Sequence, residues 1–201
     1  RNDGGVLCAL YRQLAFSAGS RYTLLAWEFA WRPAGSAPAP WAHGDEPFDV
    51  RQLGSCPHHV AAGVAPPSPG SGGKRKRPPM DDHRFKSVAV LCAEGAALAD
   101  DIACVATGTA DAALSLLAFA PRSRRWASVA ALRHHQCPVL ALAALPAPAA
   151  GWLASGGTDG VVALWDLRAQ VADAATRCAT ERWSPPSVNV PALLIPASHQ
   201  S

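Results

Sequence analysis

Three residues of the chain have the types found in a hydrolytic catalytic triad. They are His135, Ser155 and Asp159, and such residues held in a row perform acyl transfer through an activated serine. A serine nucleophile of this kind often lies in a Gly-x-Ser-x-Gly turn. The sequence around Ser155 reads Leu-Ala-Ser-Gly-Gly, so this turn is absent. The elements around the three residues must therefore decide between a chemical and a structural role.

Ser155 and Asp159 lie in a hairpin pattern that recurs along the chain. Each copy has a short apolar strand ending near Ser or Thr, a tight polar turn, and a second apolar strand. In the last copy the turn contains Asp159-Gly160, a strong hairpin signal because both residue types tolerate positive φ. The copies align without gaps over Ala15–Phe29, Val105–Phe119 and Leu153–Leu167.

The spacing of the copies is that of a long structural repeat. Leu117 and Trp165 are 165 − 117 = 48 residues apart, close to a repeat of about 40–45. Trp27 and Leu117 are 117 − 27 = 90 apart, which indicates either two repeats or one repeat with a long insertion. We prefer the insertion. A strand beginning at His135 precedes the last hairpin, 159 − 135 = 24 residues before Asp159.

This pattern resembles the WD40 repeat, in which each blade of a β-propeller is a four-stranded antiparallel sheet. The matching residues are His135, Ser155, Asp159 and the Trp165-Asp166 pair. The resemblance implies a buried relay in which Asp159 holds His135, His135 bonds Ser155, and Ser155 reaches the Trp165 indole. Because buried polar groups must find partners, such a relay fixes the geometry of its blade. The role implied for the triad-like set is structural.

The other two copies match the WD40 pattern only in part. Leu117 stands where Trp is expected, Arg84 where His is expected, and Arg21 at the Asp position of the first copy. We expect these two blades to depend more on apolar packing. The relay positions that they keep are Ser17, Trp27, Thr107 and Asp111.

The predicted fold class is all-β, a partial β-propeller of about three WD40-type blades with a long disordered insertion. Residues 66–73 are almost wholly Pro, Ser and Gly, a composition that buries too little apolar area to offset chain entropy. The expected organisation is the end of a blade at 1–32, a mostly disordered insertion at 33–82, a degenerate blade at 83–132, the best-matching blade at 133–196, and the start of another blade at 197–201.

Outer strands are the least certain elements from sequence. Phe48–Leu53 or Val60–Val64 is a candidate for the first blade, the segment around Trp126 for the second, and Ala192–Ile195 for the third. Residues 168–190 are expected to be irregular.

Basic residues are candidate contacts for RNA or a protein partner. A net charge of +3 is too small to indicate nucleic-acid binding by itself. The run near position 75 is either an import signal or a solvated loop, and the arginines before Trp126 lie in a predicted turn. The candidates are Lys74, Arg75, Lys76, Arg77, Arg122, Arg124 and Arg125.

No metal or cofactor site is predicted. Cys56, His58 and His59 have ligand types, but a structural zinc site needs about four ligands at set spacings. The six cysteines form no Cys-x-x-Cys pair, and we expect reduced thiols in a reducing compartment. No apolar run is long enough to span a membrane.

The segments Arg133–Leu140, Ser155–Leu167 and Ala197–Ser201 also resemble one group of divergent WD-repeat proteins. Members of this group are non-catalytic partners of FtsJ-type tRNA ribose 2′-O-methyltransferases. The resemblance implies a cytoplasmic scaffold that positions tRNA for methylation of the wobble ribose and has no catalytic residues of its own. The alternative is a general WD40 interaction platform, such as a ubiquitin-ligase substrate receptor or a chromatin-complex subunit, with a nuclear location.

Overall fold

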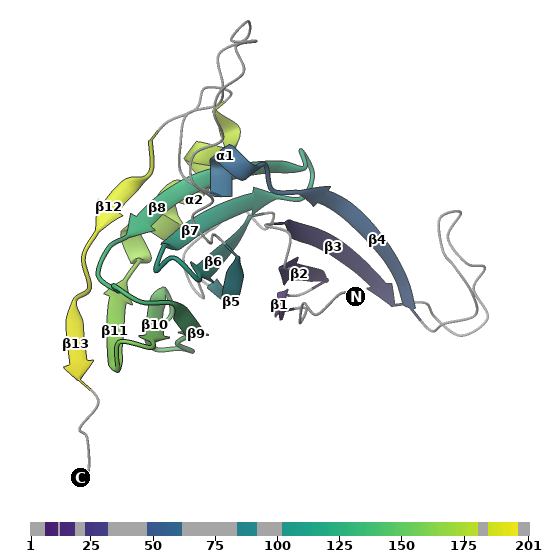
Figure 1. The fold of residues 1–201 in the computed structure, drawn as a ribbon. Helices are drawn as coiled ribbons and strands as arrows, with labels where there is room; N and C mark the ends of the chain where they lie inside the picture. The colour runs from purple at the N-terminus through teal and green to yellow at the C-terminus, as the bar shows by residue number, and fades with distance from the viewer. Residues whose placement is uncertain are drawn as a thin grey trace, which may run out of the picture.

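The fold is mostly β, with three sheets of four or five strands. The computed structural model describes residues 7–11, 13–18, 23–31, 48–61, 84–91, 102–180 and 185–196. The sheets radiate from a common centre (Figure 1), where β5 of the middle sheet lies against β1 of the first sheet and β9 of the third. In the described part of the chain, no helix is long and apolar enough to cross a membrane.

The first sheet is an antiparallel meander whose outer strand comes from one of the two candidate segments. Its fourth strand lies inside the predicted insertion at 33–82, and a short helix, α1 (His58–Ala61), follows it. The first sheet therefore extends beyond residue 32, to Ser55. Of the two candidate outer strands, Phe48–Leu53 is confirmed. In the other candidate, Val60 and Ala61 belong to α1, and residues 62–64 lie outside the described residues. The strands are β1 (Leu7–Tyr11), β2 (Leu14–Ala18), β3 (Leu24–Trp31) and β4 (Phe48–Ser55).

The middle sheet contains four antiparallel strands and one added parallel strand. Its outer antiparallel strand includes Trp126, as predicted. The added strand, β12, pairs in parallel with β8, which the sequence did not indicate. The strands are β5 (Phe85–Leu91), β6 (Ala103–Thr109), β7 (Leu114–Ala120), β8 (Arg125–Leu132) and β12 (Ser187–Asn189).

The third sheet has four antiparallel strands, with a helix inserted before the last one. The outer strand predicted at Ala192–Ile195 is present as β13, beside β11. The helix, α2 (Arg168–Ala179), and β12 separate β11 from β13 along the chain. The strands are β9 (Val139–Ala144), β10 (Trp152–Gly157), β11 (Val161–Asp166) and β13 (Leu193–Pro196).

The prediction that residues 168–190 are irregular is wrong for Arg168–Ala179, which form the helix α2. Its buried residues Val171, Ala174 and Cys178 recur at helical spacing and pack in the apolar layer behind the middle sheet. At its start, the Asp166 carboxylate accepts hydrogen bonds from the backbone N–H and guanidinium of Arg168. The hydrogen bond from the Arg168 side chain is the main reason that the pKa of Asp166 lies below its ordinary value.

The three predicted hairpins occupy equivalent places in the three sheets. Each consists of the second and third strands of its sheet, and the strand registers agree residue by residue with the gap-free alignment. In every copy the retained Ser or Thr lies two residues beyond the partner of the Trp or Leu. The directly opposed pairs are Ala15 with Trp27, Val105 with Leu117, and Leu153 with Trp165.

Each sheet has a front face, which carries Trp27, Leu117 or Trp165, and a back face opposite. The back face of the first sheet packs on the front face of the middle sheet in one apolar cluster that includes Phe16 and Leu117. The back face of the middle sheet packs on the front face of the third sheet in a second cluster that includes Leu116 and Trp165. The same kind of contact is therefore made twice.

The packing predicts how two leucines differ in their contribution to stability. Leu116 is fully buried, whereas Leu140 is 51% exposed. Leu116→Ala should lower the free energy of unfolding by about 2–5 kcal/mol, because the cavity cannot close completely. Leu140→Ala, the matched control, should change it by about 0.5 kcal/mol or less. Urea denaturation of the two purified variants measures both values, and equal losses would contradict the packing.

Candidate functional site

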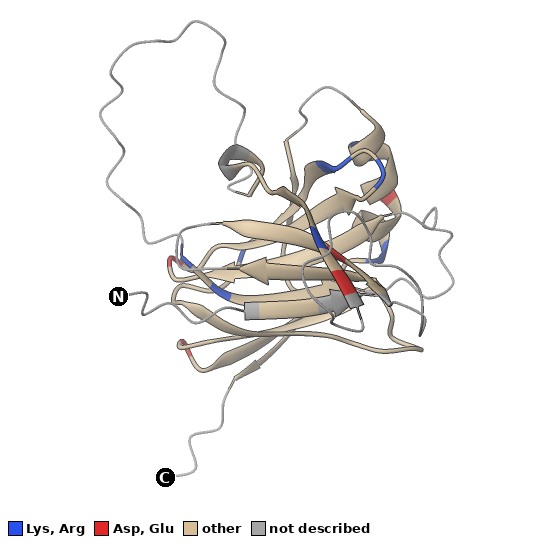
Figure 2. Ribbon diagram, turned by 90° about the vertical axis from the view of Figure 1, so that its right-hand side faces the viewer, with Lys and Arg blue, Asp and Glu red and all other residues tan. Residues whose placement is uncertain are grey.

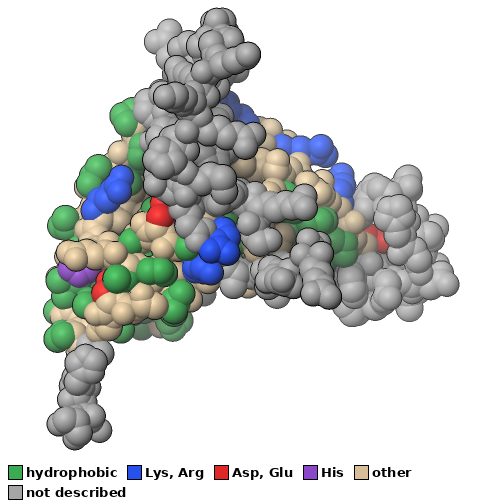
Figure 3. All heavy atoms as spheres, viewed as in Figure 1, with side chains coloured by type: hydrophobic (Ala, Val, Ile, Leu, Met, Phe, Trp, Pro, Cys, Tyr) green, Lys and Arg blue, Asp and Glu red, His purple; other side chains and the backbone are tan. Residues whose placement is uncertain are grey.

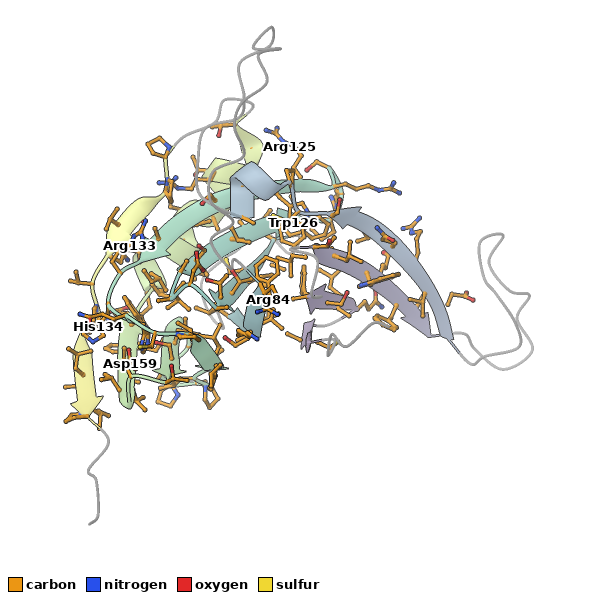
Figure 4. The ribbon with its side chains drawn as sticks, in the orientation of Figure 1. Arg84, Arg125, Trp126, Arg133, His134 and Asp159 are labelled. Carbon is orange, nitrogen blue, oxygen red and sulfur yellow. The ribbon has the colours of Figure 1, made fainter. Side chains whose placement is uncertain are left out.

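The four side chains expected to form a relay come from two strands of the third sheet, the turn between them and the segment that precedes β9. Ser155 lies on β10 and Trp165 on β11, where both side chains point to the front face. Asp159 lies in the turn that joins these strands, and His135 precedes β9. Figure 4 shows Asp159 at the third sheet. The hairpin thus brings residues that are 24 positions apart into contact with one another.

Three hydrogen bonds join the four side chains in the order that the sequence predicts. The Trp165 indole N–H donates to Ser155 Oγ at 2.8 Å. Ser155 Oγ and His135 Nε2 are 2.8 Å apart, as are His135 Nδ1 and Asp159 Oδ2. Because an ionised carboxylate only accepts, the pattern assigns the proton to Nδ1 and leaves Nε2 to accept the Ser155 hydroxyl. Every link of the chain then has one donor and one acceptor.

The relay is buried and its acidic end is ionised. Trp165 is 0% and Ser155 is 1% exposed, so neither polar group reaches water. Partial burial of Asp159 acts to raise its pKa, but hydrogen bonds from His135 and from the backbone of Val161 and Gln136 outweigh it, and the pKa falls below its ordinary value. The carboxylate is therefore held in the form that accepts the His135 proton.

Gly157 leaves the space that the histidine occupies. A Cβ atom at this position would lie 2.8 Å from Asp159 Oδ1 and 2.9 Å from His135 Nδ1. In the middle sheet, the strand register places Thr109 at the equivalent position, since Thr109 pairs with Phe85 as Gly157 pairs with Val139. The repeat pattern did not single out this glycine, although the contrast between Gly157 and Thr109 at one repeat position is a signal that the sequence contains.

In the middle sheet, a hydrogen bond between Thr109 and Asp111 stands in place of the relay. The Thr109 hydroxyl donates to the carboxylate of Asp111, so the side chain that Gly157 lacks takes part in holding the turn. Thr107 is buried beside Leu117 on the front face, which offers no indole donor. The turns of the middle and third sheets have the same backbone conformation, since φ is 65° at Ala112 and 72° at the equivalent Gly160.

The first copy keeps the half of the relay that serves its tryptophan. The Trp27 indole donates to Ser17 Oγ at 2.7 Å, the same contact as between Trp165 and Ser155. Arg21, predicted at the Asp position, lies outside the described residues. The indole donor is therefore satisfied in both sheets that contain it.

The prediction that Arg84 stands at the histidine position is wrong. The carbonyl of Arg84 accepts from the N–H of Ala110 at 2.9 Å, just as that of Pro138 accepts from Thr158 at 3.1 Å. Arg84 is thus equivalent to Pro138 and not to His135. Arg84 was misplaced because the paired residues Phe85 and Thr109 are 109 − 85 = 24 positions apart, whereas the equivalent Val139 and Gly157 are 157 − 139 = 18 apart. Positions counted back from the hairpin turn therefore do not match between the two sheets.

The other candidate residues do not join the relay. Arg122 and Arg124 are exposed in the turn that precedes β8, and the guanidinium of Arg125 donates to the carbonyl of Thr180. Figure 4 shows Arg125 and Asp159 at well-separated places, and Figure 2 shows Lys and Arg near α2 and at strand ends. Lys74, Arg75, Lys76 and Arg77 lie outside the described residues.

Cysteine and histidine side chains form no metal centre in the described ranges. No group of three or more potential ligands is present there. The side chains of His58 and His59 are outside this description. The described cysteines are free thiols; burial raises the pKa of Cys104 to about 12 and that of Cys178 to about 11, so these thiols behave as small apolar side chains.

One inter-sheet contact was not anticipated from the sequence. Ser87 Oγ donates to the carbonyl of Val139 at 2.9 Å, which joins β5 of the middle sheet to β9 of the third. Gly108 permits this approach, because a Cβ there would lie 2.5 Å from Ser87 Oγ and 2.8 Å from Val139 Cγ1. The sheets are therefore joined by a buried hydrogen bond as well as by apolar packing.

Comparison with known proteins gives no family for this chain. No protein-family model and no curated protein matches it. Among solved structures, the computationally designed Ika4 protein is similar at 13% identity with a TM-score of 0.45, over 83% of this chain and 69% of that one. The designed Ika8 protein has 12% identity and a TM-score of 0.43, over 92% of this chain and 39% of that one.

Two neighbouring glycines provide a test of the relay. Gly157→Ala should lower the free energy of unfolding by about 1–3 kcal/mol, because the methyl group displaces His135 or Asp159. Gly156→Ala is the matched control, since its Cβ would meet only Ala141 Cβ, at 3.9 Å. Urea denaturation compares the two variants. A Gly157→Ala variant as stable as the control would show that the close approach is not needed.

The lowered pKa of Asp159 predicts how its contribution depends on pH. The ionised form is the one that the fold stabilises, so the contribution is complete above the ordinary pKa of about 3.9 and is lost as pH falls through the lower folded pKa. The stability difference between the wild type and Asp159→Asn should be constant from pH 7 to pH 5 and shrink below about pH 4. Urea midpoints across this range measure it. A difference independent of pH would contradict the lowered pKa.

Proposed function

We propose that this chain is a set of neighbouring repeats from a WD-repeat β-propeller that acts as a non-catalytic scaffold. The relay of His135, Ser155, Asp159 and Trp165 is the observation that supports this most directly. Its order is the one that the WD40 resemblance implies, and it lies between sheets whose hairpins share one register.

The burial of the serine favours a structural role over hydrolysis. Ser155 Oγ already accepts the Trp165 indole N–H and contacts His135. A nucleophile must reach its substrate at about 3 Å, but Ser155 is 1% exposed and lies against the middle sheet. His135 and Asp159 are residue types that would activate a serine at an open site. In this structure their hydrogen bonds hold the strands of the third sheet together.

Within this class, we propose that the full-length protein is the partner of an FtsJ-type tRNA 2′-O-methyltransferase. The support is the resemblance of the segments Arg133–Leu140 and Ser155–Leu167 to that group of WD-repeat proteins. The methyl donor and the chemistry belong to the partner enzyme. The scaffold holds the anticodon stem–loop so that the wobble 2′-hydroxyl meets the donor methyl, an orientation effect worth several kcal/mol.

Exposed arginines offer contacts for the RNA backbone in this scheme. Arg122 and Arg124 lie together in the turn before β8, and both are exposed. Guanidinium groups bind phosphate oxygens with two parallel hydrogen bonds, and such contacts position a nucleic acid without reading its sequence. Arg125 is less exposed, and its guanidinium donates to the carbonyl of Thr180.

The proposal is tested in cells that lack the full-length protein. Wobble-ribose methylation of cellular tRNA, measured by mass spectrometry, should be lost and should return with the wild-type protein. Gly156→Ala should restore it fully. Arg122→Glu with Arg124→Glu should restore less methylation while leaving the amount of protein and its binding to the methyltransferase unchanged.

Affinity purification of the tagged full-length protein separates the alternatives. Recovery of an FtsJ-type enzyme, together with loss of methylation in its absence, supports the proposal. If neither is observed, the tRNA function is refuted, and co-purification of ubiquitin-ligase or chromatin subunits would favour a general interaction platform. Full wobble-ribose methylation in cells without the protein would also refute the tRNA function.

A further inference from the structure

The outer edge of the middle sheet is covered by a strand from a distant part of the chain. β12 pairs in parallel with β8 over Ala130–Leu132, and Figure 1 shows it at the outer margin of the molecule, beyond β8. The Ser187 hydroxyl adds a hydrogen bond to the carbonyl of Val129 at 3.2 Å. The rim of this sheet therefore accepts an extended segment that is not part of the sheet's own meander.

β12 in turn has an outward edge of its own. The carbonyl of Asn189 accepts the N–H of Arg133 at 2.9 Å, so the backbone polar groups of Asn189 point toward β8. Because the backbone groups of successive residues in a strand point to alternate sides, those of Val188 point away from β8. β12 is the last strand of its sheet, and no described strand pairs with it on that side. Val188 thus presents an N–H donor and a C=O acceptor at the rim.

The side chains beside this edge are apolar and exposed. Val188 is 69% and Val190 is 76% exposed, although the sheets on both sides of the middle sheet are in place. A further sheet would pack on the first or the third sheet and not on this rim, so both valines stay exposed in a larger stack. Residues 184–198 contain no Asp, Glu, Lys or Arg, and Figure 3 shows apolar side chains along the same margin.

A backbone edge beside aliphatic side chains fits one kind of ligand. The edge of a strand pairs with another extended chain, and in such complexes the backbone hydrogen bonds supply affinity while alternate side chains supply specificity. Natural edge strands are commonly protected from such pairing by charged residues, and β12 carries none. The same lack of charge disfavours a nucleic acid, whose phosphates bind Lys and Arg. The edge is therefore suited to an uncharged, aliphatic segment of a protein.

We propose that the protein partner of the scaffold docks here, by adding an extended segment with aliphatic side chains to the outward edge of β12. The identity of this partner, an FtsJ-type methyltransferase, rests on the proposed function. β12 pairs only with the last three residues of β8, whereas Arg122 and Arg124 precede the first residue of that strand. The partner and the RNA backbone therefore bind at opposite ends of β8, and one molecule holds both.

The test is isothermal titration calorimetry of the purified full-length protein with the purified methyltransferase. Val188→Asp should raise the Kd at least about tenfold, because a carboxylate would be buried against the aliphatic side chains of the docked segment. Val188→Pro should have a similar effect, since it removes the outward N–H and leaves the N–H groups that face β8. Val188→Thr is the matched control, because it keeps this N–H and the branched shape, and should change the Kd by less than about twofold. Circular dichroism checks that each variant is folded.

Amide hydrogen exchange provides a second measurement on the same complex. The N–H of Val188 should exchange more slowly when the methyltransferase is bound, because it then donates a hydrogen bond. Binding that Val188→Asp and Val188→Pro leave unchanged, or exchange at β12 that is the same in the free and bound protein, would overturn this proposal and leave the proposed function intact. A wild-type protein that does not bind the methyltransferase would refute the proposed function and this inference together.

Discussion

The contact between the back face of one sheet and the front face of the next determines which residue types occur along each strand. The middle sheet is covered on both sides, and the side chains of β6 are buried along its whole length. Such a strand shows no alternation of polar and apolar residues, because neither face meets water. Small residues such as Ala106 and Gly108 lie where neighbouring sheets approach closely, which explains why so much of the apolar content of this chain is alanine.

The relay follows from placing tryptophan in this contact. An indole buried between two sheets carries one N–H donor, and leaving it without a partner would cost about 1–3 kcal/mol. Ser155 and Ser17 each accept that donor, and in the third sheet His135 and Asp159 continue the chain to the edge of the sheet. Where Leu117 replaces tryptophan, no indole N–H is present, and no histidine is needed to continue a relay from it. The side chain of Thr109 can then fill the space that, beside Gly157, is taken by His135 and Asp159.

These relations explain what could be predicted from the sequence. The hairpins were correctly predicted because their turn residues and apolar runs are local signals, and the relay partners followed from their fixed positions within one repeat. Arg84 was misassigned because the connection between the first two strands is 24 − 18 = 6 residues longer in the middle sheet than in the third, which shifts the first strand relative to the hairpin. The helix α2 was missed because alanine separates its few larger apolar residues, and its burial depends on packing against β7 and β8 of the middle sheet. The strand β12 pairs with β8 through a parallel contact that no sequence-local pattern encodes.

The division between internal contacts and free surfaces also limits where function can lie. Among the described residues, the triad-like side chains of His135, Ser155 and Asp159 bond to one another and to Trp165, so they hold the third sheet together. The turn before β8 lies outside these contacts and carries the exposed Arg122 and Arg124. A turn tolerates a change in sequence without disturbing the packing of the sheets, which is why the proposed RNA contacts are assigned to it.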